Sequence, residues 1–554
     1  MNRKLGQIVL VAVILLWFSG VGIVLARAPE PEDETGLQAT TVDQITSPYS
    51  VRATYNTTIT VDSGTDPDDS KSKTCSGESV CTLRRAIVEA RGLSAGDLPV
   101  LIRFDIPATA AEGYDSGLEV WEIEVYNTSD TFAFRRLTEQ ITIDGTTQSG
   151  GRADGPKIIL IGPGTGQKNG LLVGDIVGDD EIVIRGLGMQ NFKTHVTINT
   201  DANIVEDCWF GLSSDGTTLS SGDDTEHEGG SGLALTGGAE NNVIRNNKFA
   251  GFFGVAAAIR GTGNEFTGNW VGMRSDGTVP IPNQFDTHPC SGSAWAGGVG
   301  ITVEGDDHQI GGPDAADGNR FAGLYLDLFE QSEQPYAIQF AGSNNDVLIQ
   351  NNIIGLDSAG DPVGICGRGI KLANGPEGTR VINNTIVEPG LSAILMNHWT
   401  LNGNTLRGNV IKRESPWPAA QGDNTFAEGA IAYGSGVPDP LRTFSPAAVT
   451  EIDGTDVSGT SGSGSPCAFC TVEVFLDDQD TVVEALESLA LVTADGDGTW
   501  TATLPAPLED DEGLRTMSTV PDDWTITGLD GGTTSNLSML YVGGYEVLLP
   551  LVLR

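Results

Sequence analysis

An imperfect repeat in the middle of the chain leaves few folds open to it. The pattern apolar-x-x-Asn-x-apolar, often followed by glycine, recurs in residues 204–211, 243–251, 265–272, 347–355, 380–386 and 402–411. The apolar stretches are short and alternate like strands. Asparagine and glycine tolerate the left-handed backbone angles of sharp turns. The repeat therefore predicts a solenoid, in which each coil adds short strands around a shared apolar interior.

The spacing of the repeat indicates the length of one coil. Asn246 and Gly268 lie 22 residues apart, and Asn384 and Asn404 lie 20 apart, which suits a single coil in each case. Larger intervals indicate inserted loops, which gather on one face of a repeat protein. Asparagines at equivalent turns can stack, with each side-chain amide bonding the backbone of the neighbouring coil. We predict an all-β protein in which residues 151–445 form a right-handed parallel β-helix.

Three repeats run into related turns, at residues 211–217, 272–278 and 355–361. The first two share the sequence Ser-Asp-Gly-Thr, which is typical of a tight turn. A catalytic site is not expected in three copies. We therefore interpret these segments as structural turns.

Residues 1–28 have the features of an export segment. Arg3 and Lys4 precede an uncharged apolar run over residues 8–26, and Ala26 and Ala28 offer a cleavage site of the A-x-A type. Pro29 directly follows that site, and the run is about as long as a membrane-spanning helix, so a cleaved signal peptide and an uncleaved membrane anchor both fit. Residues 29–54 are interpreted as an acidic linker. We expect a secreted or cell-surface protein that meets a membrane only through its N-terminal segment.

The charge of the chain excludes one class of partner. The sequence has 31 Lys and Arg against 74 Asp and Glu, a formal net charge of −43. Nucleic-acid binding needs clustered Lys and Arg, so no nucleic-acid partner is expected. The acidity favours solubility at a cell surface. Acidic loops also suit Ca²⁺, although no EF-hand or nonapeptide repeat is present, and no other cofactor is indicated.

The seven cysteines suit an exported protein, because disulfides persist outside the cytosol. Cys75 with Cys81, and Cys467 with Cys470, are close enough in sequence to close small loops. A metal site at the second pair is the alternative, without a second Cys-x-x-Cys or a nearby histidine to support it. An odd count leaves at least one thiol unpaired. The cysteines whose pairing the sequence leaves open are Cys208, Cys290 and Cys366.

Residues 55–150 have the order of elements of a known module. Alternation over residues 55–61 and an acidic loop with Cys75 are followed by residues 81–90, whose apolar positions have helical spacing, and by a strand around Phe104. This order, with the sequence Cys-Thr-Leu-Arg-Arg-Ala-Ile, resembles the CSLREA-type N-terminal module of secreted bacterial proteins. Arg85 stands where that family has Glu. The resemblance implies a helix that caps the open end of a β-helix.

The sequence changes character after Trp417, where the coils fade, and again at residue 446. Residues 470–476 and 514–519 alternate like strands, and residues 489–504 are expected to form strand, tight turn and strand. An Asp-Gly-Thr-Trp turn and a terminal Thr-Ser-Asn-Leu-Ser resemble elements of the bacterial Ig-like β-sandwich. The resemblance implies a small sandwich over residues 446–540 that spaces, caps or docks. The apolar tail, residues 541–554, is expected to pack as a final strand, and a sorting or docking signal is the alternative.

The predicted β-helix resembles the fold of pectate lyases and polygalacturonases, which act on polysaccharides. Asp201 in an Asn-Thr-Asp triplet, then Asp223 and Asp224, then Arg368 and Lys371 follow the polygalacturonase order of Asn-Thr-Asp, Asp-Asp and Arg-x-Lys. Glycoside hydrolysis needs paired carboxylates, and Asp201 and Asp223 lie 22 residues apart, about one coil. However, the family's Gly-His-Gly element is absent, and the Arg-to-Lys spacing has one extra residue. These five residues are therefore weak catalytic candidates.

The favoured interpretation is a noncatalytic surface protein that acts in adhesion, in glycan or protein binding, or as a structural component of a surface layer. An extracellular polysaccharide or a surface protein is the expected partner. The alternative is a polysaccharide lyase or glycoside hydrolase with its site on one face of the β-helix. Tryptophans could stack on sugars, although burial in the core explains them as readily; the candidates are Trp209, Trp270, Trp295, Trp399 and Trp417.

Overall fold

The computed structural model describes most of residues 51–554. The described ranges are 54–67, 73–126, 130–138, 140–164, 168–174, 181–217, 230–252, 254–279, 299–324, 336–397, 403–414, 416, 428–462, 466–524, 529–542 and 545–546. The predicted export segment, residues 1–28, and the linker, apart from residue 54, lie outside these ranges. Within them, no helix has the length and apolar character needed to cross a membrane.

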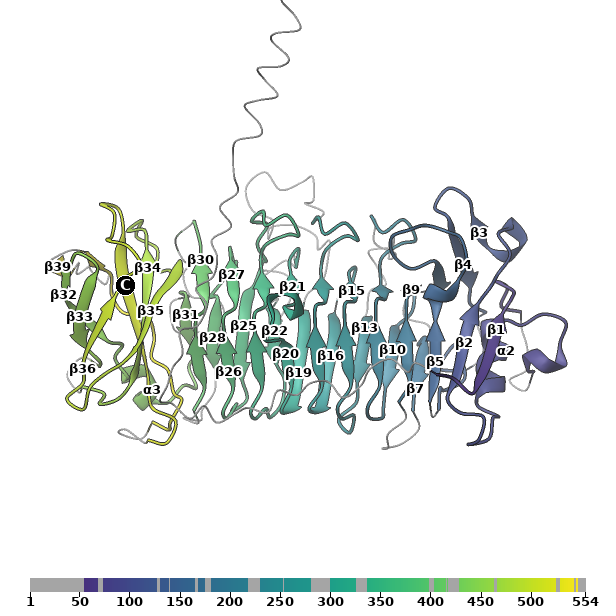
Figure 1. Ribbon diagram of the computed structural model, residues 1–554, viewed down its shortest axis with the longest axis horizontal. Coiled ribbons are helices and arrows are strands. Elements are labelled where there is room, and N and C mark those ends of the chain that lie inside the picture. The colour runs from purple at the N-terminus through teal and green to yellow at the C-terminus, as the bar shows by residue number, and fades with distance from the viewer. Residues whose placement is uncertain are drawn as a thin grey trace, which may run out of the picture. The chain divides into compact units, whose positions relative to one another are not determined.

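Three long sheets, parallel except for one antiparallel pair, make up most of this part of the chain (Figure 1). The chain visits the first, second and third sheet in turn and then returns to the first, so neighbouring strands come from successive coils. This confirms the predicted parallel β-helix, while its right-handed sense stays a prediction. The strands of the first sheet are β1 (Thr57–Val61), β2 (Val100–Phe104), β5 (Ile141–Asp144), β8 (Val183–Arg185), β11 (Ile204–Glu206), β14 (Val243–Arg245), β17 (Glu265–Thr267), β20 (Gln309–Gly311), β23 (Leu348–Gln350), β26 (Arg380–Ile382) and β29 (Thr405–Arg407).

The other two sheets follow the same order along the chain. The strands of the second sheet are β3 (Tyr114–Asp115), β4 (Val120–Glu124), β6 (Ile158–Ile161), β9 (Leu187–Gln190), β12 (Trp209–Phe210), β15 (Lys248–Phe249), β18 (Trp270–Val271), β21 (Arg320–Phe321), β24 (Ile353–Ile354), β27 (Thr385–Val387) and β30 (Val410–Lys412). The strands of the third sheet are β7 (Leu171–Val173), β10 (Thr194–Ile198), β13 (Ser231–Leu235), β16 (Val255–Thr262), β19 (Val299–Asp306), β22 (Tyr336–Phe340), β25 (Arg368–Ala373), β28 (Ile394–Asn397) and β31 (Ile431–Tyr433). Strand β31 pairs with β28 and so extends the third sheet beyond Trp417, where the coils were expected to fade.

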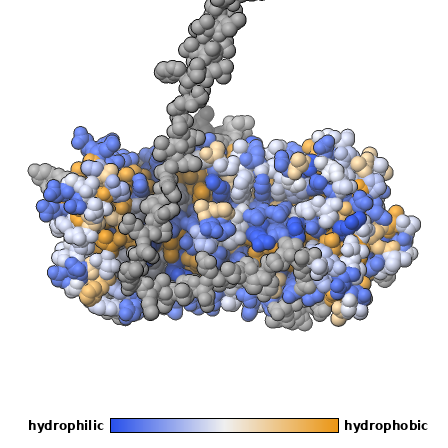
Figure 2. Space-filling model, in the orientation of Figure 1, coloured by the Kyte–Doolittle hydropathy of each residue, from blue (hydrophilic) through white to orange (hydrophobic). Residues whose placement is uncertain are grey.

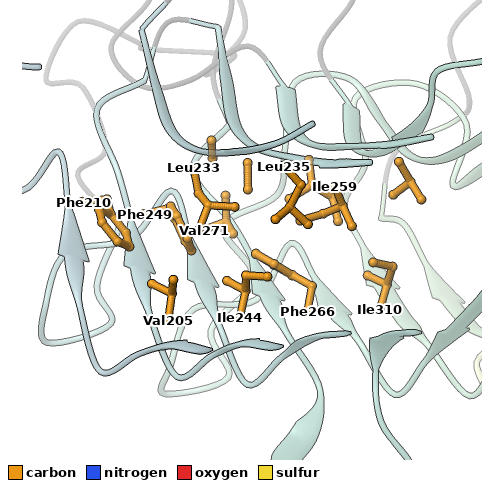
Figure 3. Packing of buried hydrophobic residues seen from close by; sticks show 14 of the residues in the cluster. Val205, Phe210, Leu233, Leu235, Ile244, Phe249, Ile259, Phe266, Val271 and Ile310 are labelled. Carbon is orange, nitrogen blue, oxygen red and sulfur yellow. The ribbon is translucent and has the colours of Figure 1, made fainter. Parts of the chain in front are cut away.

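Side chains in register from coil to coil fill the interior. Ile244 pairs with Phe266 across β14 and β17, and Phe210 pairs with Phe249 across β12 and β15. Their rings and branched chains point into the space between the sheets (Figure 3). The rings of Phe210 and Phe249 stack with centroids 5.0 Å apart. Each coil therefore buries its apolar residues only by packing on its neighbours.

Buried asparagines join the coils at the turn between the first and second sheets. In this ladder, each Oδ1 after the first accepts hydrogen bonds from the backbone N–H and the Nδ2–H of the preceding asparagine. Its members are Asn247, Asn269, Asn319, Asn352, Asn384 and Asn409. The predicted stacking of asparagines is thus confirmed.

One assignment within the repeat was wrong. Asn384 and Asn404 are not equivalent positions of successive coils, because Asn384 bonds to Asn409, whereas Asn404 lies at the turn between the third and first sheets and accepts from Thr379 N. The sequence pattern is the same at both turns, so spacing alone could not separate two ladders. Asn246 and Gly268, in contrast, occupy the same left-handed position of consecutive coils.

Helix α2 (Leu83–Ala90) follows the first strand and packs on it. Thr82 Oγ1 accepts from the Arg85 N–H at the start of the helix, and the four apolar positions with helical spacing are buried in the main core. Arg85 itself donates to the carbonyl of Val80. The helix is therefore where residues 81–90 predicted it, while its action as a cap stays a prediction.

The C-terminal module, residues 448–546, consists of two antiparallel sheets that share an apolar core. Residues 489–504 supply one strand to each sheet, so β35 and β36 do not pair as a hairpin. An Ig-like assignment stays a prediction. The strands of the two sheets are β32 (Ala448–Asp453), β33 (Asp456–Thr460) and β36 (Thr499–Thr503), and β35 (Glu487–Thr493), β34 (Thr471–Asp477), β37 (Gly513–Thr519), β38 (Tyr541–Val542) and β39 (Tyr545–Glu546); α3 (Asp439–Thr443) precedes them.

Backbone pairing joins this module to the last coil. Ile411 of β30 and Ala485 exchange two backbone hydrogen bonds of 2.8 and 3.0 Å. The Gly408 N–H donates to the buried carboxylate of Glu473 at 2.9 Å. Unpaired strand edges invite association with other chains, and here the module pairs with the edge of β30.

Candidate functional site: an acidic groove beside the last coils

Arg368, a catalytic candidate, is the centre of a buried ion pair. Its Nε and Nη2 both donate to the carboxylate of Glu428, and the two side chains are 0% and 1% exposed. Glu428 also accepts from the Ser392 N–H at 3.1 Å. A side chain enclosed in this way has no open face for a substrate, so its contacts are explained by packing.

Of the remaining candidates, Lys371 meets Arg368 at the ring of Tyr336, whose centroid lies 5.9 Å from the Arg368 guanidinium, and Asp201 lies far from both. Asp201, in the turn after β10, accepts the Glu240 N–H at 2.8 Å. It lies five strands away from β25 along the third sheet, roughly 24 Å at the usual strand spacing. Lys371 places its Nζ 4.6 Å from the centroid of the Tyr336 ring. Asp223 and Asp224 lie outside the described residues.

The three related turns stack on one another, as expected of structural turns. Ser275 N donates to Gly216 O at 2.9 Å, and Ser358 N donates to Gly277 O at 3.1 Å. These bonds connect turns that are two coils apart, because the coils of β15 and β21 lie between them. The repeated segment therefore has a packing role.

Two of the candidate tryptophans belong to the same stack. Lys248 Nζ lies 4.3 Å from the ring centroid of Trp270 and 5.6 Å from that of Trp209, and the Arg152 guanidinium lies 4.5 Å from Trp209. Trp209 is buried, and cations cover both rings. Neither ring is an open platform for a sugar. The other candidates, Trp295, Trp399 and Trp417, lie outside the described residues.

A groove of about 800 Å³ lies where the last coils meet the C-terminal module. Seven of its twelve lining residues are Asp or Glu, and none of the twelve is Lys, Arg or His. We call it the junction groove; its lining residues are Asp306, Asp307, Asn345, Asp346, Glu377, Gly378, Gly403, Asp522, Asp523, Trp524, Asp530 and Gly531.

One wall of the junction groove is a column of turns between the third and first sheets. Asp307 and Asp346 adopt left-handed angles, with φ of 58° and 53°, as short polar side chains can. Asp306 Oδ1 accepts from both the backbone N–H and the Nδ2–H of Asn345, at 3.0 and 2.8 Å. The turn geometry therefore fixes a row of carboxylates at this edge, one coil after another.

The opposite wall is a loop of the C-terminal module that follows β37. The backbone N–H of Trp524 donates to Pro521 O at 3.0 Å and closes a turn. Asp522 and Asp523 of the same turn also line the groove. The two walls meet at Gly403 and Gly531, where a Cβ added to Gly403 would lie 2.5 Å from the Gly531 carbonyl oxygen. Glycine at Gly403, with a φ of 56°, permits this close approach.

Trp524 stands out among the tryptophans that the structure describes. Its side chain is 39% exposed, whereas Trp121, Trp209 and Trp500 are buried. Figure 2 shows one face of the molecule, on which hydrophilic and apolar patches alternate. The large apolar side chains exposed in the described part of the chain are Val80, Tyr126, Phe469, Leu491, Trp524 and Met539.

Sequence reasoning missed the junction groove. Its walls come from residues about 120–225 positions apart in the chain, and neither wall carries a motif. A local signal existed in the sequence Pro-Asp-Asp-Trp at residues 521–524, where a large aromatic residue follows polar turn residues. Trp524 was nevertheless not among the candidate tryptophans.

One acidic cluster bears on the expectation of Ca²⁺. Within the described residues, Asp478, Asp480 and Glu484 place carboxylate oxygens within 4.8 Å of one another. Asp480 already accepts the Val482 N–H at 2.7 Å, and Glu484 accepts the Arg413 N–H. The oxygens suit Ca²⁺ in kind, but three carboxylates supply only part of its usual set of six to eight oxygen ligands. The Ca²⁺ site stays a prediction.

The cysteines are mostly paired. Cys75 with Cys81, and Cys467 with Cys470, form disulfides. Cys366 is also in a disulfide. Cys208 is a buried free thiol, and burial raises its pKa to about 12, which makes it a poor nucleophile.

Comparison with known proteins gives no family for this chain. No family model matches it, and no curated protein matches it in sequence. Among solved structures it is similar to an alginate lyase from Paenibacillus sp. str. FPU-7, at 14% identity and a TM-score of 0.29, over 69% of this chain and 99% of that chain. Tailspike protein 2 of bacteriophage CAB120 of Escherichia coli O157:H7 gives 10% identity and a TM-score of 0.28, over 77% of this chain and 59% of that chain. The A-module of a mannuronan C-5 epimerase from Azotobacter vinelandii gives 12% identity and a TM-score of 0.27, over 64% and 93%. Similarity at this level carries no argument about activity, and the parallel β-helix rests on this chain's own sheets.

Proposed function

We propose that this chain is an exported surface protein that binds a polysaccharide in the junction groove without cleaving it. The observation that carries the proposal is the exposed ring of Trp524 set among carboxylates. A tryptophan is usually well buried, because its large apolar surface is costly to expose. The face of an aromatic ring can pack on the C–H face of a sugar, while carboxylate oxygens accept hydrogen bonds from sugar hydroxyls.

The charge of the groove narrows the class of polysaccharide. Among the described residues, seven carboxylates and no lysine, arginine or histidine line it, so an anionic chain such as a polyuronate would meet like charge at close range. A neutral polysaccharide is not repelled by these charges, and its hydroxyl groups can donate hydrogen bonds to the carboxylates. We therefore propose a neutral glycan as the ligand.

Export is proposed from independent features. The basic, apolar and small-residue order of residues 1–28 is that of an export segment. Three sites of disulfide bonding, at Cys75 with Cys81, at Cys366, and at Cys467 with Cys470, suit an oxidising compartment. The net charge of −43 suits a soluble surface.

A lyase or hydrolase on the same face is the second candidate. The carboxylates of the groove favour it, because glycoside hydrolysis uses a pair of them. Against it, Asp306 is engaged with Asn345, and Asp307 and Asp346 are turn formers. The described lining also has no lysine or arginine to act as the base of a lyase. These contacts give the acidic residues a structural reason to be present.

Glycan binding by wild type and Trp524→Ala tests the proposal. We expect wild type to bind neutral glycans and not polyuronates on an array, and we expect Trp524→Ala to weaken that binding roughly tenfold, as loss of a central aromatic contact does. Leu491→Ala is the matched control, because Leu491 is 52% exposed on β35 of the same module but does not line the groove.

Two outcomes would reject the proposal. Equal affinity of Trp524→Ala and wild type would remove the groove as the site. Release of new reducing ends or unsaturated products from any bound glycan, lost in Asp306→Asn or Asp522→Asn, would replace binding with catalysis.

A further inference from the structure

Phe469, outside the junction groove, contacts the ring of Trp524. The two ring centroids lie 5.2 Å apart at an interplanar angle of 74°, so the edge of one ring meets the face of the other. Phe469 is 46% exposed and Trp524 is 39% exposed. Two large aromatic side chains therefore lie together at the surface, next to a groove that one of them lines.

The backbone holds Phe469 in this place by a covalent loop. Phe469 lies between Cys467 and Cys470, which form a disulfide, and its φ is 59°, a left-handed angle that a non-glycine residue adopts at a cost. Its N–H donates to Asp495 O at 3.3 Å, and its ring lies over Gly496, where an added Cβ would be 3.2 Å away. The loop thus presents an aromatic side chain outward where a glycine would fit without strain.

We infer that Phe469 and Trp524 together form a corner that holds one sugar unit of the glycan, and that the Cys467–Cys470 loop positions Phe469 for this. The inference rests on the proposed glycan binding in the junction groove. In this edge-to-face pair the edge of one ring covers part of the face of the other, so the open surface is a ring face with a second ring standing at an angle beside it. A flat, ribbon-like glycan needs coplanar ring faces along its length. The corner therefore selects a neutral glycan that bends or branches at this unit over a straight β-1,4-linked ribbon.

The continuity of the corner with the groove supports one shared occupant. Trp524 belongs to both, and Asp522 and Asp523 precede it in the same turn. A chain that bends at the corner keeps its neighbouring units within reach of carboxylates that accept hydroxyl protons. The acidic surroundings also disfavour an anionic partner, and a purely apolar partner would leave these carboxylates without donors.

The test compares Phe469→Ala, Phe469→Tyr and Trp524→Ala by calorimetric titration with a branched or β-1,3-linked neutral oligosaccharide and with a straight β-1,4-linked one. We expect wild type to prefer the bent ligand and Phe469→Ala to lose roughly threefold to tenfold in affinity for it, with a much smaller change for the straight one. Phe469→Tyr keeps the ring and should keep the affinity. Gly496→Ala, which forces the Phe469 ring to shift, should lie between wild type and Phe469→Ala.

The disulfide is tested by the double variant Cys467→Ser, Cys470→Ser. We expect it to bind the bent ligand as weakly as Phe469→Ala does. The same change at Cys75 and Cys81, the other described small disulfide loop, is the control and should leave affinity unchanged. If the double variant at Cys467 and Cys470 does not fold, the single variants at Phe469 and Gly496 decide the question.

The outcomes separate the inference from the proposed function. If Trp524→Ala loses binding while Phe469→Ala does not, or if wild type prefers the straight ligand, the inference about the corner is wrong. The proposed glycan binding in the junction groove would then remain. If neither variant changes binding of any glycan, both are wrong.

Discussion

Glu484 places a carboxyl group where the C-terminal module meets the last coil. Its side chain is buried and accepts the Arg413 N–H. Burial first, and then the nearby charges of Asp478, Asp480 and Asp477, raise its pKa from 4.5 to about 7. Because the folded state disfavours the ionised form, its contribution to stability is fully present below pH 4.5 and is lost as the pH rises through about 7.

The variant Glu484→Gln tests this pH dependence. We expect it to unfold at the same temperature as wild type at pH 4 and at a higher temperature than wild type at pH 8. The gain in free energy of unfolding at pH 8 should be on the order of 1 kcal/mol. Thermal unfolding in EDTA measures both, without a divalent cation to screen the charge. A difference between the two proteins that is the same at pH 4 and pH 8 would contradict the assignment.

A second prediction at the residue scale concerns Arg368. Removing it leaves Glu428 buried without its ion-pair partner, so Arg368→Ala should lower the free energy of unfolding by about 3–5 kcal/mol. Lys371→Ala, on the same strand but half-buried, should cost less than about 1 kcal/mol. Chemical denaturation measures both. If both variants lost the same small free energy of unfolding, the ion pair of Arg368 would not explain why the residue is there.

At the scale of elements, the asparagine ladder ties the coils together. Asn319 accepts from Asn269, donates to Asn352 Oδ1 at 2.9 Å and donates to Phe266 O at 2.7 Å, all in the buried interior. Strand pairing holds neighbouring coils through the backbone, and the ladder adds bonds at a turn where the backbone alone leaves groups unpaired.

Asn319→Ala is expected to lower the free energy of unfolding by about 2–4 kcal/mol, because it leaves several buried polar groups unsatisfied. Asn374→Gly is the matched control: Asn374 is exposed and left-handed, with a φ of 62°, a conformation that glycine adopts freely. Urea denaturation compares the two. An equal effect at both positions would show that the ladder adds little to the strand pairing.

At the scale of the whole described unit, the C-terminal module protects the last coil. Strand β30 would otherwise present an unpaired edge, and Ala485 N and O satisfy Ile411 there. The module also brings Trp524 to the turn column of the solenoid, so the junction groove exists only when both parts are present.

Removing residues 446–554 should therefore cause association of the β-helix through its exposed edge. Light scattering after size-exclusion chromatography measures the oligomeric state. Ala485→Pro, which removes only the N–H that Ile411 O accepts, is the milder variant and should weaken docking without removing the module. A truncated chain that stays monomeric and unfolds as cooperatively as the full chain would contradict this role.

The amino-acid sequence by itself determined the parts of this protein that depend on local signals. The Asn and Gly repeat predicted the parallel β-helix, helical spacing predicted α2, and two short cysteine spacings predicted two disulfides. In each case the residues that decide the feature lie within a few positions of one another or recur at the same turn. Such patterns follow from backbone angles and side-chain periodicity alone.

Only the tertiary structure decided which residues form a site. It placed Arg368 against Glu428, 60 positions away, and so turned a catalytic candidate into a buried ion pair. It also brought Asp306 and Trp524 to the walls of one groove, although neither has a sequence pattern that points to the other. The physical reason is that burial and proximity depend on how the last coil and the C-terminal module pack, and packing between distant segments leaves no period in the sequence.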